Sequence, residues 1–262
     1  MAYEQLLVDR DGTVATVRLN HPSTLNALSD TMTAELNEAL ALLADDGDVR
    51  AIVVTGEGRG FCPGADLGDI DRAGAGEARP SDLLEGGYAR AARRLASAPK
   101  PVIAAVNGVA AGAGMALALA CDIRIASDAA WFTMGFVRIG LAPDSGAAFF
   151  LPRIVGAARA LELSITGERV EAGRALEIGL VSRVVPADRL HEETMELANR
   201  LAEMPTTAIG LTKELLRDAS ALSLDETLAL EGRVQDEAAA TADHREGVTA
   251  FLEKRPPRFQ GR

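Results

Sequence analysis

The chain has 262 residues, of which 27 are lysine or arginine and 38 aspartate or glutamate, so its formal net charge is −11. With 48% apolar and 25% charged residues it can bury a full core as one large domain or a domain with an appendage, and collagen-like, low-complexity and disordered classes are excluded. The acidic balance argues against nucleic acid as a partner, because phosphate binding requires clustered lysine and arginine.

The start of the chain and its apolar runs show no sign of export or membrane insertion. Residues 1–5 contain no basic stretch followed by an apolar one, and the run Val109–Cys121 is shorter than the roughly 20 residues that cross a bilayer. Cys62 and Cys121 have no metal-ligand spacing and suit a reducing compartment. We expect a cytoplasmic protein with no membrane partner and no metal site.

Short strands alternate with helices in the first two-thirds of the chain. A hairpin is predicted around Asp11-Gly12, and a helix is predicted to begin at Ser29. Further strands are predicted at 51–55, 102–106 and 122–126, and further helices at 83–98 and from Met115 to Ala120. This alternation indicates an α/β fold.

The last third is predicted to be helical. The expected helices cover residues 157–164, 171–178, 187–203, 206–219, 224–240 and 244–254. We therefore expect a core over residues 1–200 and a C-terminal helical region over residues 201–262.

Two segments repeat one arrangement: a buried strand, a glycine-rich turn and the start of a helix. They are Ile52–Leu67 and Val102–Ala118. Neither contains the glycine spacing of a dinucleotide or phosphate-binding loop, and no Gly-x-Ser-x-Gly nucleophile motif occurs. Such turns present backbone N–H groups at a helix N-terminus, where two of them could stabilise an enolate oxygen. The alternative is that they are ordinary strand-to-helix turns whose glycines serve backbone geometry.

The residues of these turns resemble the two oxyanion motifs of the crotonase (enoyl-CoA hydratase/isomerase) superfamily. Phe61-Cys-Pro-Gly-Ala-Asp-Leu67 resembles the first motif, and the segment Asn107–Asp122 resembles the second. The similarity extends to Leu19–Leu28, Leu161–Val185 and Phe251–Pro256, and so to nearly the whole chain.

The resemblance implies a spiral of ββα units followed by a C-terminal helical trimerisation region, assembled as a homotrimer or homohexamer. It implies an acyl-CoA thioester as the ligand, with coenzyme A arriving as part of the substrate and no other cofactor. By motif position, the oxyanion donors are the backbone N–H groups of Ala65 and Ala113. The residues that it implies for CoA or acyl binding are Asn26, Ala27, Ala65, Leu67, Phe136, Phe251 and Lys254.

The catalytic glutamates of the hydratase members are missing. Their positions are occupied here by Ala116 and Phe136, neither of which can transfer a proton. The resemblance makes Asp144, in Leu141–Gly146, the acid that could replace them. Asp144 could instead cap the helix predicted to follow it. Lys254 likewise could contact CoA or simply end a solvated helix.

Within the superfamily, the segments 110–114, 139–146, 150–153 and 243–248 look most like the ring-1,2-epoxyphenylacetyl-CoA isomerases of aerobic phenylacetate degradation. This likeness implies an acyl-CoA isomerase that shifts a double bond or converts a ring epoxide to an oxepin. The alternatives are an enoyl-CoA hydratase of weak or altered activity and a non-catalytic acyl-CoA-binding protein.

Overall fold

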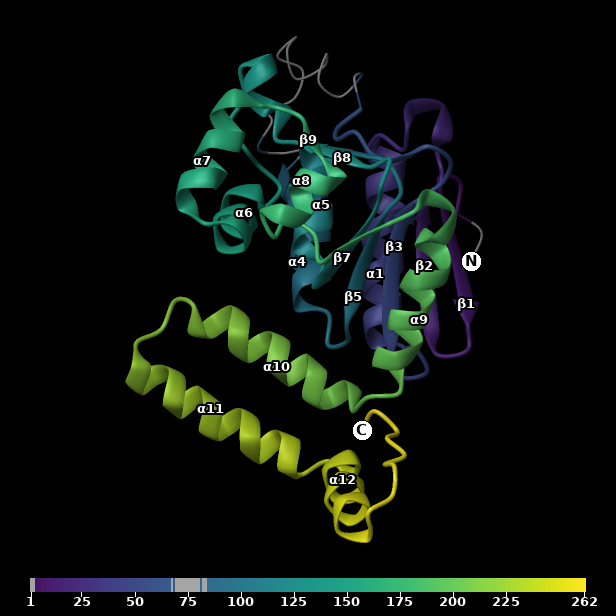
Figure 1. The fold of residues 1–262 in the computed structure, drawn as a ribbon, viewed down its shortest axis with the longest axis vertical. Helices are drawn as coiled ribbons and strands as arrows, with labels where there is room; N and C mark the ends of the chain where they lie inside the picture. Colours follow the sequence, from purple (N-terminus) through teal and green to yellow (C-terminus); the bar gives the residue numbers. More distant parts are fainter. Residues whose placement is uncertain (1–2, 67, 69–80, 82–83) are drawn as a thin grey trace.

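Two sheets form the framework of the described chain, which comprises residues 3–66, 68, 81 and 84–262 of a computed structural model (Figure 1). The larger sheet has the strand order β1-β2-β3-β5-β7-β10 and is parallel except for the β1–β2 hairpin. Its strands are β1 (Leu6–Asp11), β2 (Val14–Leu19), β3 (Ala51–Gly56), β5 (Val102–Val106), β7 (Ile123–Ser127) and β10 (Arg183–Val185).

The smaller sheet has the order β4-β6-β8-β9 and contains the strands that lead into the glycine-rich turns. Its members are β4 (Gly60–Cys62), β6 (Val109–Ala111), β8 (Trp131–Thr133) and β9 (Val170–Glu171). β4, β6 and β8 run parallel, so the carboxyl ends of β4 and β6 lie side by side.

Helices surround both sheets. In chain order they are α1 (Asp30–Asp45), the π-helical turn η2 (Leu84–Tyr88), α4 (Ala89–Ser97), α5 (Ala113–Ala120), the 3-10 turn η3 (Gly135–Ile139), α6 (Ala147–Val155), α7 (Ala157–Thr166), α8 (Ala172–Glu177), α9 (Leu190–Ala202), α10 (Thr206–Ala219), α11 (Leu224–Ala239) and α12 (Ala242–Glu253). Among the described helices, none combines the length and apolar composition needed to cross a membrane.

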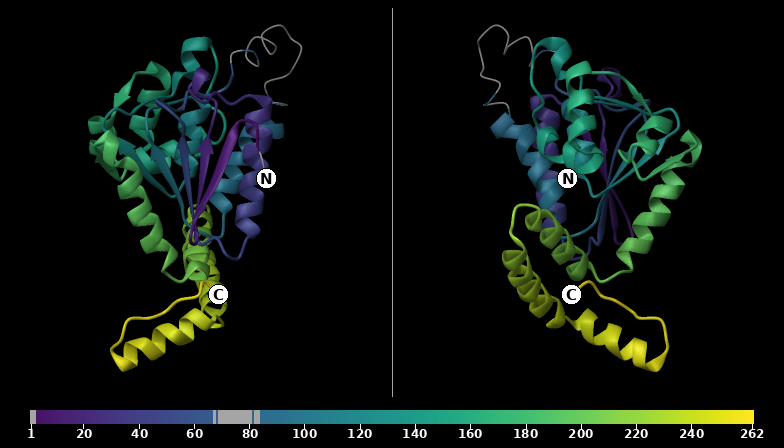
Figure 2. Two further views of the ribbon diagram at one scale, coloured as in Figure 1. Left: turned by 90° about the vertical axis from the view of Figure 1, so that its right-hand side faces the viewer. Right: turned by 60° about the vertical axis from the view of Figure 1, so that its left-hand side comes forward.

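The inner strands β2, β3, β5 and β7 of the larger sheet are buried on both faces and are therefore mostly apolar, whereas the edge strand β1 is exposed after Leu6. Successive side chains of β3 alternate between two cores: Ile52 and Val54 face the main core, whereas Ala51 and Val53 pack with Leu197 of α9. Figure 2 shows the sheet between α9 on one side and α1 on the other.

Helices α10–α12 extend away from the sheets (Figures 1 and 2). They are tied to the core by a few charged contacts. The Asp122 carboxylate accepts the Val102 N–H and pairs with Lys213 of α10, both at 2.7 Å. The Arg50 guanidinium donates to Thr206 Oγ1 at 3.0 Å and to the Phe259 carbonyl at 2.9 Å.

The expected boundary between residues 200 and 201 falls in the last turn of α9, and the division into two regions stays a prediction.

Most of the expected elements are confirmed. The hairpin forms as β1 and β2, and α1 begins after Ser29, whose hydroxyl accepts the Met32 N–H at 3.1 Å. Each helix expected after residue 157 is present within a few residues of its predicted bounds. The helix expected from Met115 begins two residues earlier, at Ala113, and this places Ala113 in its first turn.

The short strands of the second sheet were not predicted. β4 and β6 lie inside the segments expected to be loops, and β8 and β9 lie where no strand was expected, as does β10 of the larger sheet. Strands of two or three residues show no sequence periodicity, and their pairing partners lie far along the chain. The helix expected after the first glycine-rich turn falls outside the described residues.

Candidate active site

The two glycine-rich turns lie against one another because β4 and β6 are hydrogen-bonded neighbours. The backbones approach too closely for side chains: a Cβ placed on Gly114 would lie 2.1 Å from the carbonyl oxygen of Cys62. A Cβ on Gly64 would lie 3.5 Å from the backbone nitrogen of Ala113, and the φ angle of Gly64 is +108°. Glycine at both positions therefore lets one turn contact the other.

Ala65 and Ala113 present their N–H groups from these turns. Leu28 pairs with the residues on either side of Ala65: its N–H donates to the Gly64 carbonyl at 2.8 Å, and its carbonyl accepts the Asp66 N–H at 3.2 Å. The N–H of Ala65 therefore points away from Leu28. Within the described residues, neither Ala65 nor Ala113 has a partner for its N–H group.

The N–H of Ala113 also lies at the positive end of a helix. Ala113 is the first residue of α5, and it follows Gly112, whose φ angle is +50°. The first N–H groups of a helix have no partner within the helix and carry partial positive charge. With the N–H of Ala65 in the adjoining turn, this arrangement can donate two hydrogen bonds to one developing oxyanion.

The surroundings of the second turn are apolar. Ala116 of α5 is fully buried, and Phe136 of η3 is 7% exposed. The Phe136 ring lies on Gly112, since a Cβ placed there would be 3.7 Å from Phe136 Cζ. These two side chains give this part of the site an apolar surface.

Asp144 is half-buried in the loop between η3 and α6. Its carboxylate accepts a hydrogen bond from the Ser145 hydroxyl at 2.7 Å. Burial raises the pKa of Asp144 above its ordinary value, and the bond from Ser145 partly opposes that rise.

Helix α6 does not use the Asp144 carboxylate as a cap. Its N-cap residue is Gly146, and no side chain caps the helix. The Ala147 N–H donates instead to the backbone carbonyl of Asp144 at 2.8 Å. Ser145 and Gly146 both have left-handed backbone, with φ angles of +53° and +86°. The capping alternative is therefore wrong, and the carboxylate remains free of backbone bonds among the described residues.

The segment expected to contact CoA next to the first turn is largely internal. Asn26 is 0% exposed and Ala27 is 6% exposed. Both donor bonds of the Asn26 amide go to backbone carbonyls, those of Glu57 and Gly60. A ligand contact at Asn26 would therefore have to use its backbone. Leu67 lies outside the described residues.

Phe251 and Lys254 do not approach the turns within one chain. Phe251 is 83% exposed on α12, and Lys254 ends that helix with a φ angle of +56°. Figures 1 and 2 show α12 at the opposite end of the molecule from α5. The neighbouring Arg255 is paired with Glu246 and Glu253.

Neither cysteine has the properties of a nucleophile. Cys62 and Cys121 are buried, and burial raises the pKa of each thiol to about 12. A thiol with so high a pKa is protonated at neutral pH, so both cysteines act as small apolar residues.

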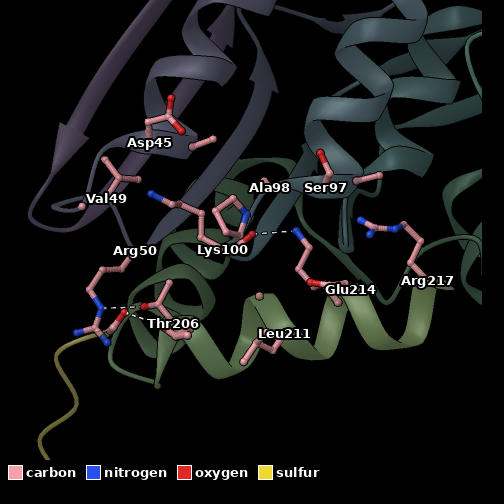
Figure 3. Close-up of a pocket in the computed structure, with 18 of the residues that line it drawn as sticks. Asp45, Val49, Arg50, Ser97, Ala98, Lys100, Thr206, Leu211, Glu214 and Arg217 are labelled. Carbon is pink, nitrogen blue, oxygen red and sulfur yellow. Dashed lines mark hydrogen bonds between the residues drawn. The ribbon is translucent and has the colours of Figure 1, made fainter. Parts of the chain in front are cut away.

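A separate cavity of about 390 Å³ lies between the core and α10 (Figure 3). Its two lysines are occupied: Lys100 Nζ donates to the carbonyls of Leu43 and Asp46, each at 2.8 Å. Lys213 Nζ donates to the Lys100 carbonyl at 2.9 Å. We therefore place the candidate site at the paired turns rather than in this cavity.

The chain is similar to known proteins over nearly its whole length. The sequence profile described as enoyl-CoA hydratase/isomerase matches residues 9–262. The chain is 45% identical over 250 residues to the 1,2-epoxyphenylacetyl-CoA isomerase of Escherichia coli, with 95% of each chain covered. It is 35% identical to the short-chain-enoyl-CoA hydratase of Clostridium acetobutylicum, with 97% of each covered. The crystal structure of an enoyl-CoA hydratase subunit I from Geobacillus kaustophilus superposes with a TM-score of 0.91 at 40% identity, covering 99% of each chain.

Gly114→Ala should destabilise the fold by roughly 1–3 kcal/mol, because the new methyl group would collide with the Cys62 carbonyl and push the turns apart. Gly173→Ala is the matched control, since no atom lies within 4 Å of a Cβ at Gly173 of α8. Urea unfolding measures both free energies of unfolding. Equal stability of the two variants would contradict the close approach of the turns.

Proposed function

The chain belongs to the enoyl-CoA hydratase/isomerase family, and from this premise we propose that it is an acyl-CoA isomerase. One observation carries the proposal: two backbone N–H groups without a partner among the described residues lie in adjoining turns beside apolar Ala116 and Phe136. In addition, the half-buried Asp144 carboxylate lies outside the capping network of α6.

In the proposed reaction, the thioester oxygen accepts hydrogen bonds from the N–H groups of Ala65 and Ala113. The Asp144 carboxylate removes a proton from C2 of a 3-enoyl thioester, and the electron pair moves onto the thioester oxygen to give a dienolate. The same carboxyl group then returns the proton at C4, and the double bond moves into conjugation. No atom is gained or lost, and no cofactor besides the CoA of the substrate takes part.

The apolar residues beside the second turn favour isomerisation over hydration. Adding water across a double bond requires groups that hold the water and transfer its proton. Ala116 and Phe136 can do neither, and the Phe136 ring lies within van der Waals distance of a Cβ placed on Gly112. The dienolate is then expected to recover its proton from Asp144, and the conjugated thioester is released without addition of water.

The identity of the acyl group has two candidates. The 45% identical relative is named a 1,2-epoxyphenylacetyl-CoA isomerase, which supports conversion of a ring epoxide to an oxepin. A double-bond shift in a 3-enoyl thioester uses the same oxyanion donors.

Two other activities are possible for the chain. Other relatives are named enoyl-CoA hydratases, so hydration is the second candidate activity, and acyl-CoA binding without turnover is the third.

We also propose that further copies of the chain cover helices α11 and α12, as a homotrimer or homohexamer. Large apolar side chains of α11 and α12 are exposed to solvent in the single chain: Leu224 is 73%, Phe251 83% and Leu252 74% exposed. Apolar groups exposed to this extent favour contact with another protein surface. Such an assembly would allow Phe251 and Lys254 to reach the acyl-CoA site of a neighbouring copy.

Asp144→Asn should lower isomerisation by about 10²- to 10⁴-fold while leaving acyl-CoA affinity nearly unchanged, because the amide cannot accept the proton. The assay is the rise in conjugated absorbance from a 3-enoyl-CoA, and loss of that absorbance from crotonyl-CoA would report hydration. Asp128→Asn is the control, because Asp128 is exposed and also adjoins a serine hydroxyl. Wild-type isomerisation by Asp144→Asn would refute the proposed base.

The pH dependence of kcat/KM should reflect Asp144. Because burial raises the pKa of Asp144, the acid limb of the pH profile should have its midpoint above 3.8, the ordinary pKa of an aspartate. Ser145→Gly removes the hydrogen bond that favours the ionised form, and glycine accepts the left-handed backbone there. The acid limb should therefore move to higher pH in this variant. An unchanged or lowered limb would show that Asp144 is not the titrating base.

The assembly is tested by sedimentation. The wild-type protein should sediment as a trimer or hexamer, and Phe251→Asp should shift the distribution to smaller species because it places charge in the apolar contact. Leu42→Asp, at a 44% exposed position of α1, should not change the distribution. A monomeric wild-type protein would contradict the proposed assembly.

A further inference from the structure

Two asparagine side chains from separate segments hold the same carbonyl group at the start of β4. Asn26 Nδ2 donates to the carbonyl oxygen of Gly60 at 2.8 Å and to that of Glu57 at 3.0 Å. Asn107 Nδ2 donates to the Gly60 oxygen at 3.1 Å and to the Gly58 oxygen at 2.9 Å. The loop that connects the two sheets is thus bonded from both sides.

The side-chain oxygens of both amides are also occupied. Asn26 Oδ1 accepts the His21 N–H at 2.9 Å, and Asn107 Oδ1 accepts the Gly56 N–H at 3.2 Å. Asn26 is completely buried. These amides therefore act through the backbone that they hold, because no donor of theirs is left for a ligand.

That backbone leads directly to both oxyanion donors. Gly60 opens β4, which runs into the turn that carries Ala65, and Asn107 opens the turn that ends at Ala113. The segment of Asn26 reaches the far end of the same stretch, since Leu28 bonds both neighbours of Ala65. The residues from Gly60 to Ala65 are therefore fixed at both ends.

The backbone conformation of the Asn26 segment is energetically unfavourable, which indicates that the segment has a functional role. Leu25 and Asn26 have φ angles of +56° and +70°, a left-handed conformation that leucine rarely adopts. Left-handed residues of this kind persist where the surrounding structure holds them, often at functional sites. The backbone held by Asn26 is also closely packed, since a Cβ on Gly56 would lie 2.2 Å from the Gly60 oxygen.

We propose that Asn26 and Asn107 are positioning residues for the oxyanion hole, and we call this pair of side chains the clasp. Their shared bonds to the Gly60 carbonyl hold β4 against β6, so that the N–H groups of Ala65 and Ala113 point at one thioester oxygen. The inference rests on the proposed function and adds to it two residues that do not contact the substrate. Removing either amide lets the first turn shift relative to the second, which weakens the bonds to the oxyanion.

The test compares Asn26→Ala and Asn107→Ala with Asn37→Ala. Asn37 is a matched control because it is 6% exposed and its amide also donates to two carbonyls, those of Thr33 and Gly87. The probe is butyryl-CoA labelled with carbon-13 at the carbonyl, an unreactive thioester. Its infrared carbonyl stretch should fall on binding to the wild type, and this fall should shrink in the two clasp variants only.

Turnover gives a second readout. The clasp variants should lose roughly 10- to 100-fold in kcat with KM changed less than about 3-fold, since a misplaced donor affects the transition state most. Asn37→Ala should keep the wild-type kcat even if its midpoint of unfolding falls. Where Asn26→Ala does not fold, Asn107→Ala decides, because Asn107 is only partly buried.

The proposal is overturned if the folded clasp variants keep the wild-type carbonyl shift, or if Asn37→Ala loses as much of it. An absent shift in the wild type would overturn the oxyanion hole together with its clasp. Because butyryl-CoA is not turned over, failure of the isomerase assignment leaves the infrared result intact and is distinguished from failure of the clasp.

Discussion

The whole site depends on two backbone turns approaching more closely than any side chain would permit. A carbonyl oxygen can accept two N–H groups only if both donors reach it within hydrogen-bond distance. Pairing β4 with β6 aligns the turns, and the bare backbones of Gly64 and Gly114 let them touch. Since the donors are backbone groups, Ala65 and Ala113 can serve without any reactive side chain. The smaller sheet is thus the element that creates the site.

Much of this could be predicted from the sequence, because the relevant signals are local. Ser29 marks the start of α1, and the Gly-rich segments identify both donor-bearing turns. β4 and β6 could not be predicted, since three-residue strands exist only through pairing with distant partners. Asp144 resembled a helix cap in sequence, but α6 has Gly146 as its N-cap after the left-handed Ser145, and no side chain caps it. The convergence of Asn26 and Asn107 on Gly60 likewise requires tertiary structure, although both residues lie in the motifs that resemble the family.

The charge of −11 describes the whole chain and says little about an anionic ligand. The charged groups close to a bound anion determine how strongly it is attracted, and the structure distinguishes Arg255 from Lys254 in this respect. Arg255 is paired with Glu246 and Glu253, which limits its contribution to a CoA phosphate. Within the described residues, no salt bridge engages Lys254, so in the proposed assembly it is less constrained than Arg255. The N–H groups at the turns attract negative charge as dipoles and add nothing to the net charge.

The central claim is that the paired turns hold an enolate whose proton is moved by Asp144 without adding water. The most direct measurement is mass spectrometry of the product formed from 3-hexenoyl-CoA in water enriched in oxygen-18. The expected product is a conjugated isomer of unchanged mass that carries no oxygen-18. A product heavier by one water, labelled with oxygen-18 at C3, would contradict it.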